Sequence, residues 1–202
     1  MKKNNIICFD MDGTLTEWKN LHIDIEQEED ADPENLQKKI YDILMTPGYW
    51  RNLCPYPYVV GLADTLRKEG YEVYILSCAI TKAAEREKKA WIHKYLPGFR
   101  EDHILFLPDG MGDRKFQIFS RKYPLEPGTS YILIDDHTPN CIGWQHSDND
   151  AHAIKLFNDI NGKNGIWQDQ CLFYDDRNME NSFFQILEEL EQEREHERDE
   201  KF

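Results

Sequence analysis

Two carboxylates, one residue apart, follow a short apolar run near the start of the chain. Residues 6–9 read Ile-Ile-Cys-Phe and lead directly into Asp10, Met11, Asp12 and Gly13. A continuous apolar run of this length predicts a strand covered on both faces, as in a parallel sheet, where ligands bind beyond the carboxyl ends of the strands. Asp10 and Asp12 would face the same side of a cleft, where they could share a divalent cation or divide the work of nucleophile and acid/base. Gly13 allows the backbone to turn sharply after them.

Three later segments carry further reactive side chains in similar settings. Residues 74–77 form an apolar run that ends in the hydroxyl of Ser77, and residues 131–136 form another that ends in the pair Asp135 and Asp136. Between them, Lys115 follows a glycine-containing loop at the head of a predicted helix. Three other lysines compete with Lys115 for a place in such a site, and they are Lys82, Lys88 and Lys89.

In order and in residue type, these four segments resemble the four motifs of the haloacid dehalogenase superfamily of phosphotransferases. The resemblance implies that Asp10 attacks phosphorus to give an aspartyl-phosphate, and that Asp12 protonates the leaving alcohol and then activates water. It also implies that Ser77 and Lys115 bind the phosphoryl group. A lone pair of acids at this spacing would be weak evidence, whereas four motifs in order are much stronger.

The same resemblance implies a metal site built from the two acidic motifs. Hard oxygen ligands shared with a phosphate group favour Mg²⁺. The protein would supply the carboxylates of Asp10 and of one member of the Asp135/Asp136 pair, with the backbone carbonyl of Asp12. The fourth motif of the superfamily often reads Gly-Asp-x-x-x-Asp, and this chain fits it when Asp136 takes the first acid position and Asn140 the last. We therefore expect Asp136 to bind the metal directly and Asp135 to contact the residues around the metal rather than the metal itself.

The elements that must position these residues are indicated by the spacing of apolar side chains. Strands are expected at 6–9, 71–77, 103–107, 131–134 and 153–157, and helices at about 33–45, 59–68 and 81–95, from 115 onward, and at 182–192. The helix at 81–95 should bury Ala84, Trp91, Ile92 and Tyr95 and expose the basic residues between them. Residues 182–185 resemble a capping box that begins the last helix. The alternation of strands and helices predicts an α/β fold, a Rossmann-like three-layer sandwich with a central parallel sheet.

The spacing of the first two motifs predicts an insertion. Asp10 and Ser77 are 67 positions apart, whereas a simple strand-helix-strand crossover needs only about 30 residues. We expect residues 18–56 to form a small helical cap over the catalytic end, and residues 1–17 and 57–192 to form the core. Residues 193–202 are so highly charged that they are expected to fray as an acidic tail.

Within the superfamily, the resemblance narrows to the 5'(3')-deoxyribonucleotidases and their bacterial relatives. It covers about residues 4–160 and is carried by segments 47–50, 53–55, 71–77, 88–92 and 132–136. It implies that the cap offers aromatic side chains to a nucleobase, with Tyr49, Trp50 and Trp18 as candidates. The alternative for each is that it packs the cap against the core. Cys78 and Ala79 stand where the animal enzymes carry more polar residues, so base and sugar preference do not carry over.

The charge of the chain limits its partners. The formal net charge is −14, and it arises from residues 24–34, with seven acidic and no basic residues, and from residues 175–202, with eleven acidic and four basic residues. Such a surface argues against binding a nucleic acid polymer, but a metal ion and one lysine suffice for a small phosphomonoester.

Targeting and redox signals are also sparse. No segment resembles a signal peptide or a membrane-spanning helix, so we expect a cytoplasmic protein that does not bind a membrane. Five cysteines without a CxxC pair are expected to be reduced and mostly buried. The sequence does not decide between a monomer and a homodimer.

Three functions agree with these observations. The leading hypothesis is a Mg²⁺-dependent phosphoric monoester hydrolase of the 5'-nucleotidase type, which hydrolyses (deoxy)nucleoside monophosphates through an aspartyl-phosphate. A second keeps this chemistry but takes a sugar phosphate or another small phosphomonoester. A third is a non-catalytic relative that binds nucleotide, and the intact Asp10/Asp12 pair argues against it.

Overall fold

The computed structural model describes residues 5–18, 33–158, 160 and 167–199, and within them six strands form one sheet. Every pairing is parallel, and the strand order is β3-β2-β1-β4-β5-β6. The strands are β1 (Asn5–Phe9), β2 (Glu72–Ala79), β3 (Ile104–Pro108), β4 (Ser130–Asp135), β5 (Ala151–Phe157) and β6 (Cys171–Phe173). The predicted α/β fold with a central parallel sheet is confirmed.

Six described α-helices and three short 3₁₀ turns connect or follow the strands. The helices are α2 (Pro33–Leu44), α3 (Pro57–Lys68), α4 (Lys82–Tyr95), α5 (Lys115–Lys122), α6 (Thr138–Gln145) and α7 (Met179–Asp199). The turns are η1 (Trp50–Asn52), η2 (Glu101–His103) and η3 (Gly112–Arg114).

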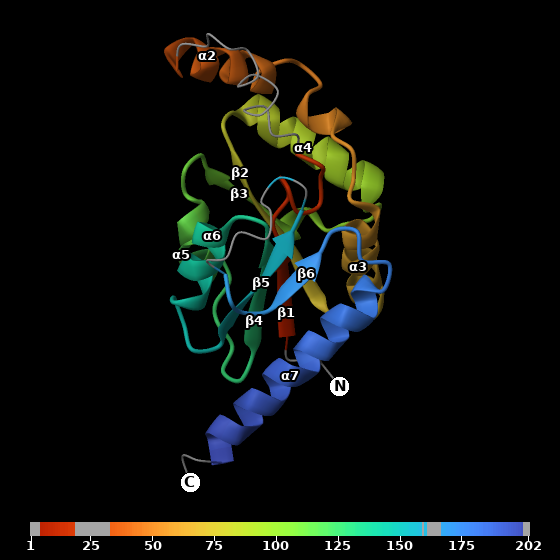
Figure 1. Cartoon of the computed structure of the whole chain (residues 1–202), viewed down its shortest axis with the longest axis vertical. Helices are drawn as coiled ribbons and strands as arrows, with labels where there is room; N and C mark the ends of the chain where they lie inside the picture. The colour runs from red at the N-terminus through yellow and green to blue at the C-terminus, as the bar shows by residue number, and fades with distance from the viewer. Residues whose placement is uncertain (1–4, 19–32, 159, 161–166, 200–202) are drawn as a thin grey trace.

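The pleat of the strands divides the core into two layers of side chains. Ile7 and Phe9 of β1 point to one face, where residues of α3, α4 and α7 cover them. Cys8 points to the other face, where residues of α5 and α6 cover it. All three are fully buried, which explains why the strand is a continuous apolar run rather than an alternating one. The result is a three-layer sandwich, with α5 and α6 on one side of the sheet and α3 and α7 on the other (Figure 1).

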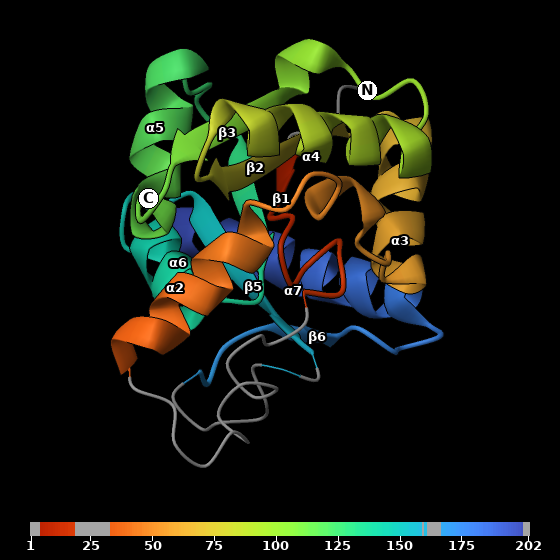
Figure 2. The ribbon, with the colours of Figure 1, turned by 90° about the horizontal axis from the view of Figure 1, so that it is seen from above.

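The described residues between β1 and α3, which are 10–18 and 33–56, lie at the end of the sheet toward which the strands run (Figure 1). Figure 1 shows α2 beyond that end, and Figure 2, seen from above, shows α2 toward the side of α6 and α4 toward the side of β2. Trp91 of α4 fixes the return to the core, because its indole N–H donates to the carbonyl of Leu53 over 2.8 Å. Residues 19–32 of the expected cap lie outside the described residues, and the division into core, cap and tail stays a prediction.

Some element boundaries differ from those expected. β5 begins two residues early, and the three-residue strand β6 was not predicted. The capping box at Ser182 is wrong, because α7 begins at Met179 and the Ser182 hydroxyl donates to the Asp176 carboxylate instead. α7 also continues to Asp199, past Gln192, because its glutamates, glutamine and arginines all favour helix.

Two statements about the whole chain can be compared with the structure. All five cysteines are free thiols, but only Cys8 and Cys141 are buried, so the expectation that most are buried is wrong. None of the helices in the described ranges is long and apolar enough to cross a membrane.

The charged end of α7 contacts the core through Arg194. Its Nη1 donates to the carbonyl of Gly128 over 3.2 Å and to the hydroxyl of Ser130 over 2.8 Å. We predict that Arg194→Ala lowers the free energy of unfolding by about 1 kcal/mol, the usual net value of such bonds, and Tm by about 2–4 °C. Thermal unfolding measures this, with the exposed Arg177→Ala as the matched control. An unchanged Tm would mean that the contact adds no stability.

Candidate active site

The acidic residues of the first and fourth motifs meet at the carboxyl ends of β1 and β4. Asp10 directly follows β1, Asp135 ends β4, and Asp136 comes next. The backbone N–H of Asp10 donates to the carbonyl of Ile134 over 2.9 Å, which aligns the two strand ends. β1 and β4 are the neighbours at which the strand order reverses, and in open parallel sheets ligands bind in the crevice at such a point.

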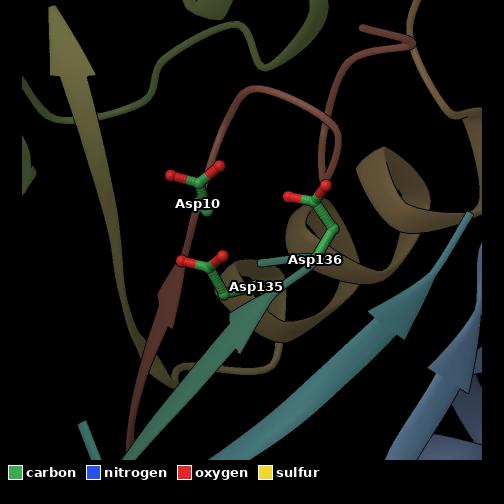
Figure 3. Close-up of side chains that lie close together, drawn as sticks. All are labelled: Asp10, Asp135 and Asp136. Carbon is green, nitrogen blue, oxygen red and sulfur yellow. The ribbon is translucent and has the colours of Figure 1, made fainter. Parts of the chain in front are cut away.

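Three carboxylates from these strand ends form an acidic cluster. Asp10, Asp135 and Asp136 each offer a carboxylate oxygen, and these oxygens lie within 4.8 Å of one another. The three residues are only 7%, 0% and 5% exposed. Figure 3 shows the carboxylates grouped above the ends of the two strands. Buried oxygens this close together are suited to a hard divalent cation.

Lys115 at the start of α5 partly offsets the charge of this cluster. Its Nζ donates to Oδ1 of Asp10 and to Oδ2 of Asp135, and the side chain is 1% exposed. Burial alone would lower the pKa of Lys115, but the two carboxylates outweigh it and raise this pKa above its usual value. Lys115 is therefore a permanent cation of the site, at the position that the third motif requires.

The cluster also perturbs the acids themselves. Burial, with the charges of Asp135 and Asp12, raises the pKa of Asp10 to about 7, although Lys115 acts in the opposite direction. Burial and the negative charges of Asp135 and Asp10 raise the pKa of Asp136 well above its usual range. The folded protein therefore stabilises the proton-bound form of these carboxyls until a cation compensates their charge.

Asp135 and Asp136 have different surroundings. The oxygens of Asp135 accept hydrogen bonds from Lys115, from the backbone N–H of His137 at 2.9 Å and from the amide of Asn140 at 3.1 Å. Asp136 accepts from the hydroxyl of Thr14 at 3.2 Å, and its own backbone N–H donates back to that hydroxyl. Asn158 also donates to Asp136, so both carboxylates are held by donors, and the difference is that Asp135 is bonded to the Lys115 ammonium group. The assignment of Asp136 as the metal ligand stays a prediction.

Gly13 is required for the approach of Asp136. Its φ is +81°, and a Cβ at this position would lie 2.3 Å from Oδ2 of Asp136. Any other residue would both strain the backbone and displace the carboxylate. The glycine of the first motif therefore serves the fourth motif, 123 positions away in the sequence.

A second buried lysine, Lys88 of α4, holds Asp12 and Ser77. Its Nζ donates to Oδ2 of Asp12, to Oγ of Ser77 over 3.0 Å and to the carbonyl of Cys78 over 2.6 Å. Lys88 is 0% exposed, so the expectation of an exposed basic stretch is wrong at this residue. The spacing of positions 84, 88, 91 and 92 is that of one helix face and could have revealed it.

Asp12 does not join the acidic cluster with its carboxylate. Oδ2 pairs with Lys88, and Oδ1 is buried with no hydrogen-bond partner among the described residues. A buried carboxylate oxygen without a donor is costly, so a ligand that supplies a hydrogen there would be stabilising. The backbone carbonyl of Asp12 remains the contribution that we expect it to make to a metal.

The candidate aromatic residues of the cap differ in exposure. Trp50 is 5% exposed, its indole N–H donates to the carbonyl of Leu44 over 2.9 Å, and the Nζ of Lys88 lies 4.2 Å from its ring centre. Tyr49 packs edge-on against Trp50 with ring centres 5.0 Å apart, and it is partly exposed, as is Trp18. The Tyr49 hydroxyl and the Trp18 indole N–H are both buried and interact with each other, so Trp18 opposes the rise that burial causes in the pKa of Tyr49.

Glu87, the neighbour of Lys88, fixes the turn that carries these aromatic residues. Its carboxylate accepts the backbone N–H of Gly48 over 2.6 Å and that of Trp50 over 3.2 Å. Sequence reasoning missed Glu87 because nothing in the pattern of α4 indicates contacts with residues almost 40 positions earlier. Adjacent residues of α4 thus hold the cap turn and Asp12.

Comparisons with known proteins give structural but no sequence matches. No protein-family model and no curated protein matches this chain. The D,D-heptose 1,7-bisphosphate phosphatase of B. bronchiseptica, solved with magnesium and phosphate, is similar with a TM-score of 0.59 and 13% identity over 92% of this chain and 99% of that chain. A provisionally named beta-phosphoglucomutase from Bacteroides vulgatus is similar with a TM-score of 0.53 and 13% identity, over 95% and 90% of the two chains. At such identities the likeness concerns the fold alone, which over the described residues is an α/β fold with a six-stranded parallel sheet.

Proposed function

We propose that this protein is a Mg²⁺-dependent phosphomonoesterase that acts through an aspartyl-phosphate on Asp10. The observation that carries the proposal is the meeting of the acidic cluster with two buried lysines at the strand ends, because Lys115 contacts Asp10 and Lys88 contacts Asp12 and Ser77. Removing carboxylates and ammonium groups from water costs free energy that their mutual attraction often does not fully offset, so such a cluster indicates a role in ligand binding. A phosphate monoester with a divalent cation matches this set of charges.

The residues present fit a magnesium ion. The carboxylates of Asp10 and Asp136, with the carbonyl of Asp12, would hold it, and Asp135 would orient Lys115 and the loop of Asn140. The carboxylates of Asp10 and Asp136 and the carbonyl of Asp12 are oxygen ligands, which Mg²⁺ prefers. When bound, the ion neutralises negative charge on the carboxylates and on the phosphoryl group.

The chemistry of the chain's own groups follows from their placement. Lys115 holds Oδ1 of Asp10, which leaves Oδ2 to attack phosphorus; the ester P–O bond breaks as the new bond forms. Asp12, through the oxygen that has no partner, gives a proton to the leaving alcohol. Asp12 then takes a proton from water, whose oxygen attacks the aspartyl-phosphate and releases inorganic phosphate and free Asp10.

Ser77 and Lys88 would bind the phosphoryl oxygens from the side of β2. The Ser77 hydroxyl donates weakly to the Cys78 carbonyl over 3.3 Å, so it can turn to a phosphoryl oxygen with little loss. Lys88 donates hydrogen bonds to both Ser77 and Asp12, so its positive charge lies beside both residues. Lys115 and Lys88 together would therefore supply the positive charge near the phosphoryl group that the sequence motifs assign to Lys115 alone.

A nucleoside monophosphate is the substrate class that we propose, as in the 5'(3')-deoxyribonucleotidases. Partly exposed Tyr49 and Trp18 can offer ring faces to a base or sugar, and buried Trp50 would pack against Tyr49 and hold it in place. A sugar phosphate is the second candidate, because one of the similar structures is a phosphatase of a heptose bisphosphate.

The first test is phosphate release from a panel of nucleoside 5'- and 3'-monophosphates, their deoxy forms and sugar phosphates. We expect Mg²⁺-dependent release that is fastest with nucleotides, and a fall of about a thousandfold or more for Asp10→Asn, which keeps the shape but removes the nucleophile. Preference for sugar phosphates would favour the second candidate. No release from any substrate, or near wild-type turnover by Asp10→Asn, would contradict the proposed function.

The raised pKa of Asp10 predicts the pH dependence of stability without metal. Because this pKa rises from 3.8 to about 7 on folding, the folded state binds more protons between these values, and the contribution of Asp10 to stability is lost as pH rises from about 4 to 7. Asp10→Asn escapes this loss.

In EDTA we expect Asp10→Asn to be more stable than the wild type at pH 7.5, by on the order of a few kcal/mol, with the difference shrinking toward pH 5. Thermal unfolding across this range measures it, and Asp109→Asn controls for loss of an exposed carboxylate. A variant less stable than the wild type at pH 7.5 would contradict the cost assigned to buried Asp10.

The two neighbouring aromatics of the cap should respond differently to truncation. Tyr49→Ala should lower kcat/KM for a nucleotide by about tenfold to a hundredfold, the range for loss of a base stack, and leave a small aliphatic phosphate unaffected. Trp50→Ala should lower the free energy of unfolding by about 3–5 kcal/mol, because Trp50 is buried and bonded to Leu44, and should slow both substrates. Equal losses on both substrates for Tyr49→Ala would remove its role in recognition.

A further inference from the structure

Two buried side chains at the end of β5 contact the loop that carries Asp136, and neither belongs to a motif read from the sequence. β5 lies beside β4 in the sheet (Figure 1). Lys155 lies within β5 opposite Asp135 and is 3% exposed, and Asn158 directly follows the strand and is 5% exposed. Polar side chains buried to this degree next to a candidate metal site call for a reason.

Asn158 joins the two loops that form the site. Its Nδ2 donates to Oδ2 of Asp136 over 3.1 Å and to the carbonyl of Gly13 over 2.7 Å. Its Oδ1 accepts the backbone N–H of Ile160 over 3.0 Å, which fixes the orientation of the amide because donors and acceptors cannot be exchanged. One amide thus holds the turn after Asp12 at a set distance from the carboxylate of Asp136.

Lys155 holds the same residue from its backbone side. Its Nζ donates to the carbonyl of Asp136 over 3.1 Å and to the hydroxyl of Thr138. No carboxylate among the described residues forms an ion pair with Lys155. A buried ammonium group bonded only to neutral oxygens is costly, and the nearby negative charge of the acidic cluster is what offsets it.

We propose that Asn158 and Lys155 are positioning residues that set the place of Asp136 and thereby the affinity of the site for a divalent cation. Thr14 and Asn158 each hold one carboxylate oxygen of Asp136, so the plane of the carboxylate is fixed from both sides. Lys155 prevents the loop from moving away from β5. Groups that orient metal ligands in this way change affinity or activity by about 10-fold to 100-fold when removed.

The inference rests on the proposed Mg²⁺-dependent function, so its test measures metal binding apart from turnover. Titration calorimetry with MgCl₂ is carried out on the metal-free wild type, Asn158→Ala and the exposed control Asn181→Ala. We expect Asn158→Ala to raise the Kd for Mg²⁺ by about 10-fold to 100-fold and Asn181→Ala to leave it unchanged. In kinetics, the Mg²⁺ concentration for half-maximal rate should rise, while kcat at saturating Mg²⁺ changes less than threefold.

Lys155→Met is the second variant, and it carries the test if Asn158→Ala fails to fold. Methionine keeps the apolar stem but removes the bond to the Asp136 carbonyl, so Mg²⁺ affinity should fall at least fivefold. A lower Tm with unchanged Kd in both variants would show a merely structural role and overturn the inference. Absence of Mg²⁺ binding by the wild type would instead overturn the metal-dependent function, and the inference with it.

Discussion

Negative charge buried at the ends of β1 and β4 is the constraint on which the rest of the structure depends. The acidic cluster and Asp12 bring four carboxylates together, and three buried lysines surround them, namely Lys88, Lys115 and Lys155. With every group ionised, the formal sum is −1, and a divalent cation changes it to +1. The site then attracts an anion such as a phosphate monoester. Burial first, and then the charges of Asp135 and Asp12, raise the pKa of Asp10, and Lys115 opposes this rise only in part.

The packing of the parallel sheet offsets the free-energy cost of bringing these carboxylates together. Strand β1 is buried on both faces and cannot shift without exposing Ile7 and Phe9, so Asp10 is delivered to a fixed place. Asp136 can approach it only because Gly13 lacks a Cβ. The free energy gained by packing the core thus holds together charges that would otherwise separate.

The sequence predicts the residues of the chemistry better than the residues that support them. Asp10, Asp136 and Lys115 stand directly after or before regular elements, so strand and helix patterns place them. Asn158 and Gly13 meet across 145 positions, and no local pattern relates them. The preference for Asp136 over Asp135 as a ligand comes from the motif spacing, and it stays a prediction because donors hold both carboxylates.

Two expectations from the sequence are wrong for equally physical reasons. Lys88 was assigned to the exposed face because lysine is usually solvated, although the helical period places it with Ala84 and Trp91. The capping box at Ser182 failed because Asp176, six residues earlier, offers the Ser182 hydroxyl a carboxylate. At Lys88 a tertiary ion pair with Asp12 outweighs the usual solvation of lysine, and at Ser182 a hydrogen bond to a nearby residue replaces the expected cap.

Two adjacent residues of helix α4 contact the turn at residues 48–50 and Asp12, the residue proposed to transfer a proton. Glu87 holds the backbone of the turn at Gly48 and Trp50, and the next residue, Lys88, holds Asp12. The ring of Trp50 lies against the Lys88 ammonium group, so the turn and the lysine pack as one unit. Under the proposed function, Glu87 and Lys88 link the turn that carries Tyr49 to Asp12, the proposed proton donor for the leaving group. The proposed recognition of a base by Tyr49 and the proposed proton transfer by Asp12 therefore depend on two adjacent residues of one helix, Glu87 and Lys88, so that a change in the turn at Gly48 would also be felt at Asp12.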